Sequence, residues 1–371
     1  MTARIMHVIN GEHYAGAERV QDLLALQLPN FGYQVGFVCT KSGLFAENRV
    51  AKDVPLYDFT MRSRIDLKLA KGMARLAQNE GYKIIHTHTA RSALLGAIAS
   101  VMSGIPMVHH VHSPTTRDTE GGFRNLRNAL VDNLCLRRAS VLVAVSDSLR
   151  EYLIEQGYGS KRIEVIANGV PSLDAVKVER RADEPLRIGM VALFRPRKGV
   201  EVLLRAMALL KQQGRVVHLH AVGPFETPEY GETVIQLSRQ LGVERDVTWV
   251  GFTKTVNAEF PKMHVFALPS LFGEGMPMVV LEAMAVGLPI VSTKVEGIPQ
   301  VVRERQDGLL VEPNDPAALA RALGELAQDP ARCLAMGASA RQRQAESFSD
   351  VSMARGVAKI YDNVLGRSKR S

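Results

Sequence analysis

Two glutamates eight residues apart carry the clearest chemical signal in the sequence. Glu274 lies in a glycine-flanked loop, whereas Glu282 is the only charged residue in the apolar stretch 276–286. A carboxylate in such surroundings is costly unless it has a partner. Two vicinal hydroxyls, as on a ribose, would supply one through bidentate hydrogen bonding. A structural salt bridge is the alternative.

A cationic loop is the second chemical feature. Residues 187–192 are expected to form a buried strand, and Arg195, Arg197 and Lys198 follow it closely. Open α/β sheets bind ligands at the carboxyl ends of their strands. An arginine forks onto two phosphate oxygens and a lysine acts as a mobile point charge, so the loop suits a diphosphate. Solvated charges on a surface loop are the alternative.

Other phosphate and metal motifs are weak or absent from the sequence. Gly16 lies where a loop enters a helix, which allows an anion to approach the backbone, although a bare turn fits equally well. The chain has no P-loop motif, and none of its predicted strands runs into G-x-G-x-x-G. Its three cysteines are far apart, so we expect buried thiols and no Cys/His ligand cluster.

Alternating strands and helices must position these residues. The first half is expected to hold strands at 4–9, 34–39, 84–87, 107–111, 141–145 and 163–166, with helices at 17–28, 66–78, 90–103 and 147–155. The second half is expected to hold strands at 187–192, 217–222, 247–250, 264–267 and 290–292, with helices at 199–212, 229–241, 277–285 and 315–328. This alternation indicates largely parallel sheets. Polar residues 172–185 form the expected linker between two domains.

The spaced glutamates, the Arg195/Lys198 loop and Val250-Gly251-Phe252 resemble the retaining sugar-nucleotide glycosyltransferases of family four. The resemblance covers essentially the whole chain. It implies an α/β fold of the glycosyltransferase B type, with two Rossmann-like domains whose parallel sheets face a central cleft. Residues 1–175, completed by a helix at about 354–366, would bind the acceptor, and 186–350 would bind the donor nucleotide.

The resemblance also implies roles for individual residues. Arg195 and Lys198 would bind the donor diphosphate, and Glu274 would contact the transferred sugar. His112 aligns best with the family's sugar-facing histidine, whereas His109 or His110 would lie in the core or behind it. The implied donor-binding residues are Gly16, Gly251, Phe252, Thr253, Gly275, Met276, Pro277 and Glu282.

The implied reaction moves a hexose to a glycan or a polyprenyl-diphosphate-linked acceptor in cell-surface polysaccharide synthesis. A UDP-sugar is the favoured donor, and GDP-mannose is open. We expect no cofactor and no metal, because the cationic loop can neutralise the diphosphate in place of Mg²⁺. A sugar-nucleotide epimerase on the same fold is one alternative, and a non-catalytic nucleic-acid-binding protein is another.

The net charge of +8 points to anionic partners. Arg64, Lys68, Lys71 and Arg75 recur on one face of the helix predicted at 66–78, as in helices that lie on anionic membranes. Arg117 and Arg124 would extend that surface or meet the acceptor. A merely solvated helix face is the alternative. The expected buried thiols indicate a reducing compartment, so we expect a cytoplasmic protein, and the basic helix face would make it peripheral on the inner face of the plasma membrane. We disfavour nucleic acid because no aromatic-rich basic stripe is present.

Overall fold

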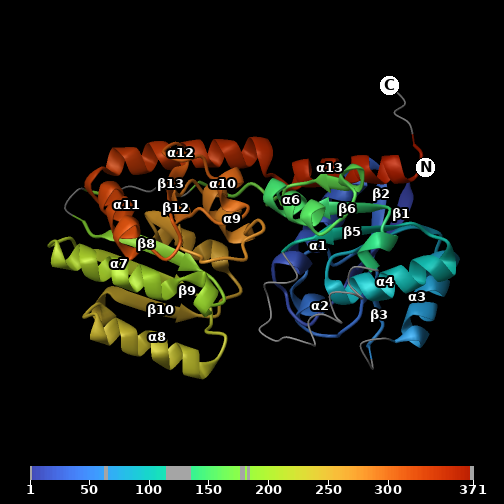
Figure 1. The fold of residues 1–371 in the computed structure, drawn as a ribbon, viewed down its shortest axis with the longest axis horizontal. Coiled ribbons are helices and arrows are strands. Elements are labelled where there is room, and N and C mark those ends of the chain that lie inside the picture. Colours follow the sequence, from blue (N-terminus) through green and yellow to red (C-terminus); the bar gives the residue numbers. More distant parts are fainter. Residues whose placement is uncertain (1, 62–65, 114–134, 176–179, 182–183, 368–371) are drawn as a thin grey trace. The chain divides into compact units, whose positions relative to one another are not determined.

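The chain forms two compact α/β units (Figure 1). The computed structural model describes residues 2–61, 66–113, 135–175, 180–181 and 184–367. The first unit comprises Met1–Gly169 together with Asp350–Ser371, and the second comprises Val170–Ser349. The chain therefore leaves the first unit after residue 169 and returns to it for its last helix.

The first unit is built on a seven-stranded parallel sheet of order β3-β2-β1-β4-β5-β6-β7. Its strands are β1 Ala3–Ile9, β2 Tyr33–Cys39, β3 Leu56–Asp58, β4 Tyr82–Thr87, β5 Met107–Val111, β6 Val141–Ala144 and β7 Ile163–Val165. Its helices are α1 Gly16–Gln27, α2 Leu44–Asn48, α3 Leu67–Asn79, α4 Ala90–Ser103, α6 Asp147–Glu155 and α13 Asp350–Val364. The sequence pattern had not indicated β3, a three-residue edge strand.

The two faces of this sheet differ in chemistry. On one face, Met6, Val8 and Ile85 form a buried apolar cluster with Leu69 and Met73 of α3. Side chains alternate along a strand, so His7 and His86 project to the other face. There both imidazoles meet the hydroxyl of Tyr361 on α13, at 3.1 Å and 2.6 Å.

The second unit contains a six-stranded parallel sheet of order β10-β9-β8-β11-β12-β13. Its strands are β8 Leu186–Val191, β9 Val217–Val222, β10 Val247–Gly251, β11 Val265–Leu268, β12 Ile290–Thr293 and β13 Gly308–Val311. Its helices are α7 Val200–Gln212, α8 Pro228–Gln240, α9 Met278–Ala285, α10 Ile298–Val301, α11 Pro316–Gln328 and α12 Pro330–Ser347. The predicted parallel α/β architecture is confirmed in both units, although β13 and α12 had not been anticipated.

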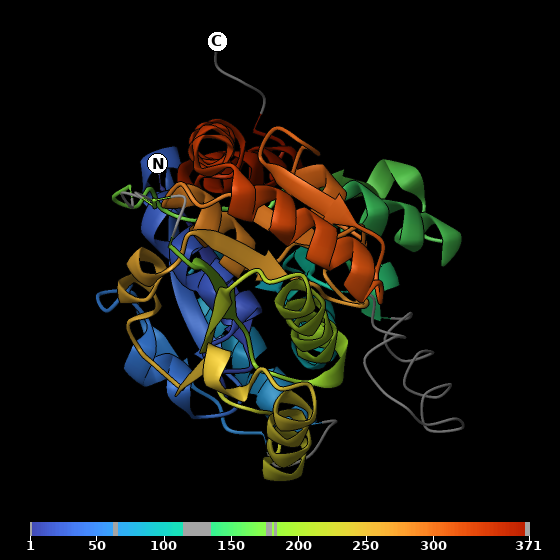
Figure 2. The same ribbon diagram turned by 90° about the vertical axis from the view of Figure 1, so that its left-hand side faces the viewer.

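Helices cover both faces of the second sheet. Helix α7 contacts α8 and α11, whereas α9 contacts α12. In Figure 2 the yellow-green and olive helices α7 and α8 lie apart from the red helix α12. Each sheet also has a topological switch point, where the chain changes the direction in which it adds strands: between β1 and β4 in the first unit, and between β8 and β11 in the second. Ligands of open α/β sheets bind beside such points.

Candidate functional site

The predicted donor-site residues meet at the switch point of the second sheet. Strands β8 and β11 are parallel neighbours, so the loops that follow them both leave from the carboxyl ends of the strands. The loop after β8 carries Arg195 and the short 3-10 helix Pro196–Lys198, and the loop after β11 carries Glu274. A backbone bond from Leu271 N–H to the carbonyl of Arg197, 2.8 Å long, joins the two loops. The cations and the carboxylate are thereby held together at the carboxyl ends of these two strands.

Lys198 and Glu274 form a buried ion pair. The Nζ atom of Lys198 donates to Oε1 of Glu274, and the two side chains are 13% and 5% exposed. Ser270 donates its hydroxyl to the same oxygen at 2.6 Å. Burial lowers the pKa of Lys198, although the Glu274 carboxylate partly opposes that effect. The ammonium group of Lys198 is therefore held in a fixed position at the carboxyl ends of the strands.

Arg197 holds the loop that presents Glu274. Its guanidinium donates to the carbonyl oxygens of Gly273 at 2.9 Å and Phe272 at 3.4 Å, and Nη1 lies 3.9 Å from Glu274 Oε1. Gly273 has a φ of +79°, and a Cβ atom there would lie 2.7 Å from Arg197. This glycine therefore permits both the turn and the close approach of the arginine.

The peptide groups of Glu274 are fixed as well. Its N–H donates to Oε2 of Glu296 at 3.1 Å, and its carbonyl accepts from the N–H of Gly297 at 3.0 Å. Arg195 is less enclosed, with a side chain 32% exposed and 3.5 Å from Glu226. Arg195 thus pairs with a carboxylate outside this loop, whereas Arg197 and Lys198 contact Glu274.

Helix α9 starts immediately after this loop. Gly275, Met276 and Pro277 are buried, and Pro277 precedes the first turn without any side-chain cap. The unsatisfied N–H groups of a helix N-terminus attract anions. Glu282 lies one turn further along α9 and is only 4% exposed.

The remaining donor-site candidates lie at the end of β10. Gly251 closes the strand with a φ of +76° and accepts the N–H of Gly223 at 2.8 Å. Phe252 follows with 65% of its surface exposed, and Thr253 donates within a polar turn to Thr255 or accepts from it. Only β9 lies between β10 and β8 in the sheet. Because all three strands are parallel, these residues lie at the same carboxyl end of the sheet as the cationic loop.

Gly16 starts α1 in the first unit. It is exposed, its φ is not positive, and the position that a Cβ would take has no neighbour within 4 Å among the described residues. Ala15 precedes the helix without a side-chain cap. Neither the backbone nor local packing therefore requires a glycine at this position.

Five histidines gather at the switch point of the first sheet. His7 projects from β1, His86 and His88 from β4 and its loop, and His110 and His112 from β5 and its loop. His88 Nδ1 lies 3.1 Å from His112 Nε2, and the His110 and His112 rings stack with centroids 4.6 Å apart. The predicted sugar-facing candidate, His112, is thus part of a cluster.

Burial keeps these rings neutral. It lowers the pKa of His112 to about 4 and that of His7 to about 3, and it lowers the pKa of His86, His88 and His110 well below the usual value. His109 projects from the opposite face of β5, where Thr87 lies 2.7 Å from its Nδ1. His109 is thus a core residue, one of the two possibilities considered for it.

The sequence pattern had not indicated this cluster of histidines, which contains no cysteine. His86 and His88, like His110 and His112, form an H-x-H pair at the end of a strand. Alternation along a strand places both members of a pair on one face. That spacing, with His7 on the adjacent strand, was the signal available. Arg197 and Ser270 were also missed as supports of Glu274.

The predicted basic surface is only partly within the described chain. Helix α3 exposes Lys68, Lys71 and Arg75, while Leu69 and Met73 on the same helix are buried. Arg64, Arg117 and Arg124 lie outside the described residues. Across the chain segments that the structure describes, no helix combines the length and the apolarity needed to span a bilayer.

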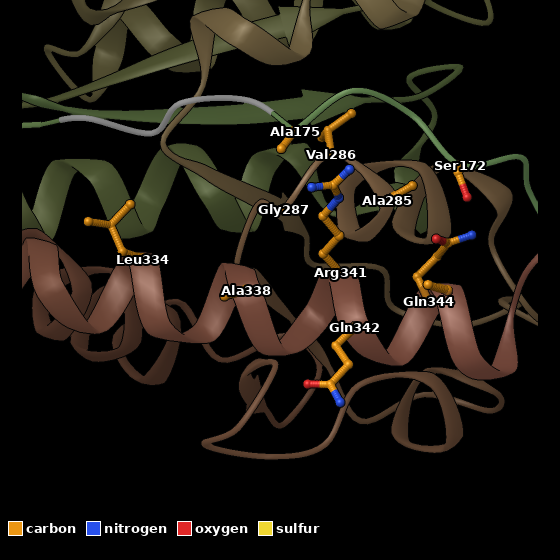
Figure 3. A pocket seen from close by; sticks show the side chains of 11 residues that line it. Ser172, Ala175, Ala285, Val286, Gly287, Leu334, Ala338, Arg341, Gln342 and Gln344 are labelled. Carbon is orange, nitrogen blue, oxygen red and sulfur yellow. The ribbon is translucent and has the colours of Figure 1, made fainter.

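A separate cavity of about 540 Å³ lies in the second unit (Figure 3). Small side chains of the α9 C-terminus and of α12 line it, and Arg341 points across it and donates to the carbonyl of Leu173 at 3.1 Å. The cavity adjoins Ala285 to Gly287, whereas the Glu274 loop adjoins the start of α9, about 12 Å away at 1.5 Å per residue. It contains none of the predicted site residues.

Comparisons with known proteins match both units. Residues 14–172 match the family described as Glycosyltransferase Family 4, and residues 185–329 match Glycosyl transferases group 1. The alpha-maltose-1-phosphate synthase of Mycolicibacterium smegmatis is 30% identical over 77% of this chain and 80% of its own.

A second relative and a solved structure match over nearly their whole length. The UDP-Gal:alpha-D-GlcNAc-diphosphoundecaprenol alpha-1,3-galactosyltransferase of Escherichia coli is 24% identical over 98% of this chain and 97% of its own. Anabaena HepE, solved in complex with UDP and glucose, superposes with a TM-score of 0.82 at 22% identity and covers 96% of this chain and 99% of its own.

Proposed function

Since the chain belongs to the family-four glycosyltransferases and has their two-domain B-type fold, we propose that it transfers a hexose from a UDP-sugar, with retention of anomeric configuration. The observation that carries the proposal is the joining of Arg195, Lys198 and Glu274 at the switch point of the second sheet. The acceptor is a glycan or a polyprenyl-diphosphate-linked sugar.

The cationic loop binds the donor diphosphate in this proposal. Arg195 is partly exposed and can fork onto phosphate oxygens, and Lys198 is held near the same edge by Glu274. The uncapped start of α9 adds backbone N–H groups for the same anion. Because these groups supply the positive charge, the leaving diphosphate needs no divalent cation.

Two carboxylates orient the donor. Glu282, buried on α9, accepts hydrogen bonds from the vicinal hydroxyls of the ribose, and Glu274 contacts hydroxyls of the transferred sugar. The peptide groups of Gly251, Phe252 and Thr253, at the end of β10, contact the base. Two similar proteins favour uridine, because the galactosyltransferase uses UDP-Gal and HepE was solved with UDP.

Catalysis is mainly electrostatic and positional. As the bond between the anomeric carbon and the diphosphate breaks, Arg195 and Lys198 stabilise the charge that develops on the departing oxygen. The departing phosphate takes the proton of the acceptor hydroxyl, which attacks the same face of the sugar. No side chain of the protein forms a covalent bond with the sugar.

The first unit supplies the acceptor side of the reaction. Gly16, which local packing does not require, allows the donor phosphate to approach the α1 backbone, and His112 contacts the sugar. The exposed lysines and arginine of α3 rest on an anionic membrane surface, on the cytoplasmic side.

Nucleotide release is the direct test. Purified protein is screened for thermal stabilisation by UDP-, GDP- and ADP-sugars, and the stabilising donor is then incubated with and without lipid-linked glycan acceptors. We expect stabilisation by a UDP-sugar, release of UDP only with an acceptor, and an α-linked product by NMR. The variant Glu282→Ala should lose the stabilisation, whereas Glu312→Ala, at an exposed position of the same unit, should keep it.

Other outcomes would contradict the proposal. Release of free nucleotide without any acceptor would instead indicate an epimerase. Inversion of the anomeric centre would refute the proposed mechanism, and stabilisation by a GDP-sugar alone would refute the choice of base.

A further inference from the structure

The histidine cluster of the first unit contains more coordinating groups than the proposed transfer reaction uses. That reaction involves His112 alone, yet the cluster contains four more imidazoles, two of which contact His112. His110 is fully buried, and neither of its ring nitrogens has a hydrogen-bond partner in the described part of the chain. His88 Nε2 is likewise buried and without a partner there, and the other ring nitrogen of His88, Nδ1, faces His112. Unpaired polar atoms in a protein interior are costly, so a native cluster of them points to a ligand.

Two overlapping triads bring ring nitrogens close enough for one ion. His7, His86 and His88 form the first, and His88, His110 and His112 form the second; within each triad the ligand atoms lie within 4.8 Å of one another. In the first triad, His7 and His86 already share the hydroxyl of Tyr361, and all three rings are buried. In the second, His112 is only partly buried and offers a route from solvent.

The distances in the second triad suit coordination. Zinc binds histidine nitrogen at about 2.0 to 2.1 Å, which places two ligands of a tetrahedron about 3.3 Å apart. His88 Nδ1 and His112 Nε2 are 3.1 Å apart. The rings of His110 and His112 now stack at an interplanar angle of 15°, so coordination would rotate them about their side-chain bonds until their lone pairs converge.

We propose that His88, His110 and His112 bind one divalent transition-metal ion of the Zn²⁺ class. Neutral imidazole is a preferred ligand of such ions, and three histidines leave a fourth position open. The backbone of His88 is held for this role, because its N–H donates to Ser92 Oγ at 3.1 Å within the capped start of α4.

The three proposed metal ligands belong to the first unit, whereas the cationic loop proposed to bind the donor diphosphate belongs to the second. A bound ion would occupy the Nε2 atom of His112, the nitrogen that faces His88. If the proposed transfer is correct, Zn²⁺ would therefore inhibit it by withdrawing that histidine from the sugar. The binding itself does not depend on the transfer, so the two proposals can fail independently.

The test uses the full-length protein without a polyhistidine tag, stripped with EDTA and dialysed. It is titrated with Zn²⁺ by calorimetry and with Co²⁺ by visible absorption, with no donor present. We expect one ion per chain, and X-ray absorption should give nitrogen or oxygen ligands at about 2.0 to 2.1 Å.

Variants assign the site. His110→Phe keeps a ring of similar size in the stack, and His112→Asn changes a partly exposed residue, so at least one should fold. Each should weaken binding roughly 100-fold or more, since even residues that only orient a ligand contribute about 10- to 100-fold. The control His218→Asn, in the second unit, should bind as the wild type does.

Either of two results would overturn the proposal. The first is a wild-type protein that retains no ion at micromolar Zn²⁺, which would make the cluster a stack of neutral rings in the core. The second is undiminished binding by the folded His110→Phe and His112→Asn variants, which would place the ion elsewhere. Thermal stabilisation by Zn²⁺ that disappears in both variants would support it independently of any sugar transfer.

Discussion

Replacement of Lys198 by methionine should destabilise the second unit because it leaves the Glu274 carboxylate buried without its main counter-charge. At an effective dielectric constant of about 20 and a separation of about 3 Å, the attraction between the two charges is about 5 kcal/mol, and desolvation of both groups offsets part of it. Breaking a buried pair from one side costs about 3 to 5 kcal/mol. We therefore expect Lys198→Met to lower the free energy of unfolding by about 3 kcal/mol.

A double-mutant cycle separates the pair from its surroundings. Glu274→Gln removes the negative charge, and the double variant removes both charges, so it should be more stable than the sum of the single losses predicts, by about 2 to 3 kcal/mol. The exposed pair Lys294 and Glu312, with side chains 48% and 67% exposed, is the matched control. Its cycle should give under about 1 kcal/mol.

Trp249 provides the assay. It is the only tryptophan of the chain, lies on β10 in the second unit, and packs against Phe194 and Phe225 at centroid distances of 5.6 Å and 5.1 Å. Its fluorescence in urea therefore follows the unit that holds the ion pair. A coupling energy below about 0.5 kcal/mol for Lys198 and Glu274 would refute the reasoning, because the pair would then be no better coupled than two independent sites. Both single variants should also lose sugar transfer.

The other predictions concern three different parts of the molecule. Gly199→Ala should destabilise the second unit by at least about 2 kcal/mol in the same assay, because residue 199 has a φ of +70° and its Cβ would lie 2.0 Å from the carbonyl oxygen of Pro269; an unchanged urea midpoint would contradict this. His264 is buried and its pKa is lowered to about 4, so the folded state favours the neutral ring. The free energy of unfolding should therefore be highest above pH 6.5, and it should fall by up to about 3 kcal/mol as the pH is lowered towards 4. His264→Asn keeps an acceptor for the Arg187 N–H, 3.0 Å away, and should unfold with a smaller loss between pH 7 and pH 4 than the wild type; an equal loss would exclude His264 as the cause. Charge reversal of Lys68, Lys71 and Arg75 to glutamate should abolish flotation with liposomes rich in phosphatidylglycerol, whereas reversal of exposed Arg239 and Arg245 in the second unit should not; unchanged flotation would count against α3 as the membrane surface.

Periodicity was sufficient to predict most of the fold. Strands buried on both faces read as short apolar runs, and β5 and β9 begin and end at the predicted residues. The elements that were missed are short or have no clear apolar face in the sequence pattern. Strand β3 has three residues and β13 has four. Helix α12 has a polar average composition and reads as a charged surface segment, because only a narrow stripe containing Cys333, Met336 and Ala340 is buried.

The candidate site could be predicted only where reactive side chains lie close together in the sequence or in a recognisable loop. Arg195 and Lys198 are close in sequence, and the glycines on both sides of Glu274 indicate that it lies in a loop. The contact between Lys198 and Glu274 spans 76 residues and depends on β8 pairing with β11, which local patterns do not specify. The histidine cluster was missed for the same reason, since His7, His86 and His110 come from three strands that become neighbours only in the sheet.

The return of the chain to the first unit has a consequence for synthesis on the ribosome. Tyr361 bonds both His7 and His86, and Tyr33 bonds Asp362 at 2.6 Å, so β1, β2 and β4 are completed by a helix that is synthesised after the whole second unit. The second unit is contiguous and can fold as soon as it emerges, whereas the first must wait, with one face of its sheet unfinished, until α13 has been made. A released chain truncated after residue 349 would therefore contain a complete second unit and an incomplete first unit, the reverse of the order in which the two were synthesised.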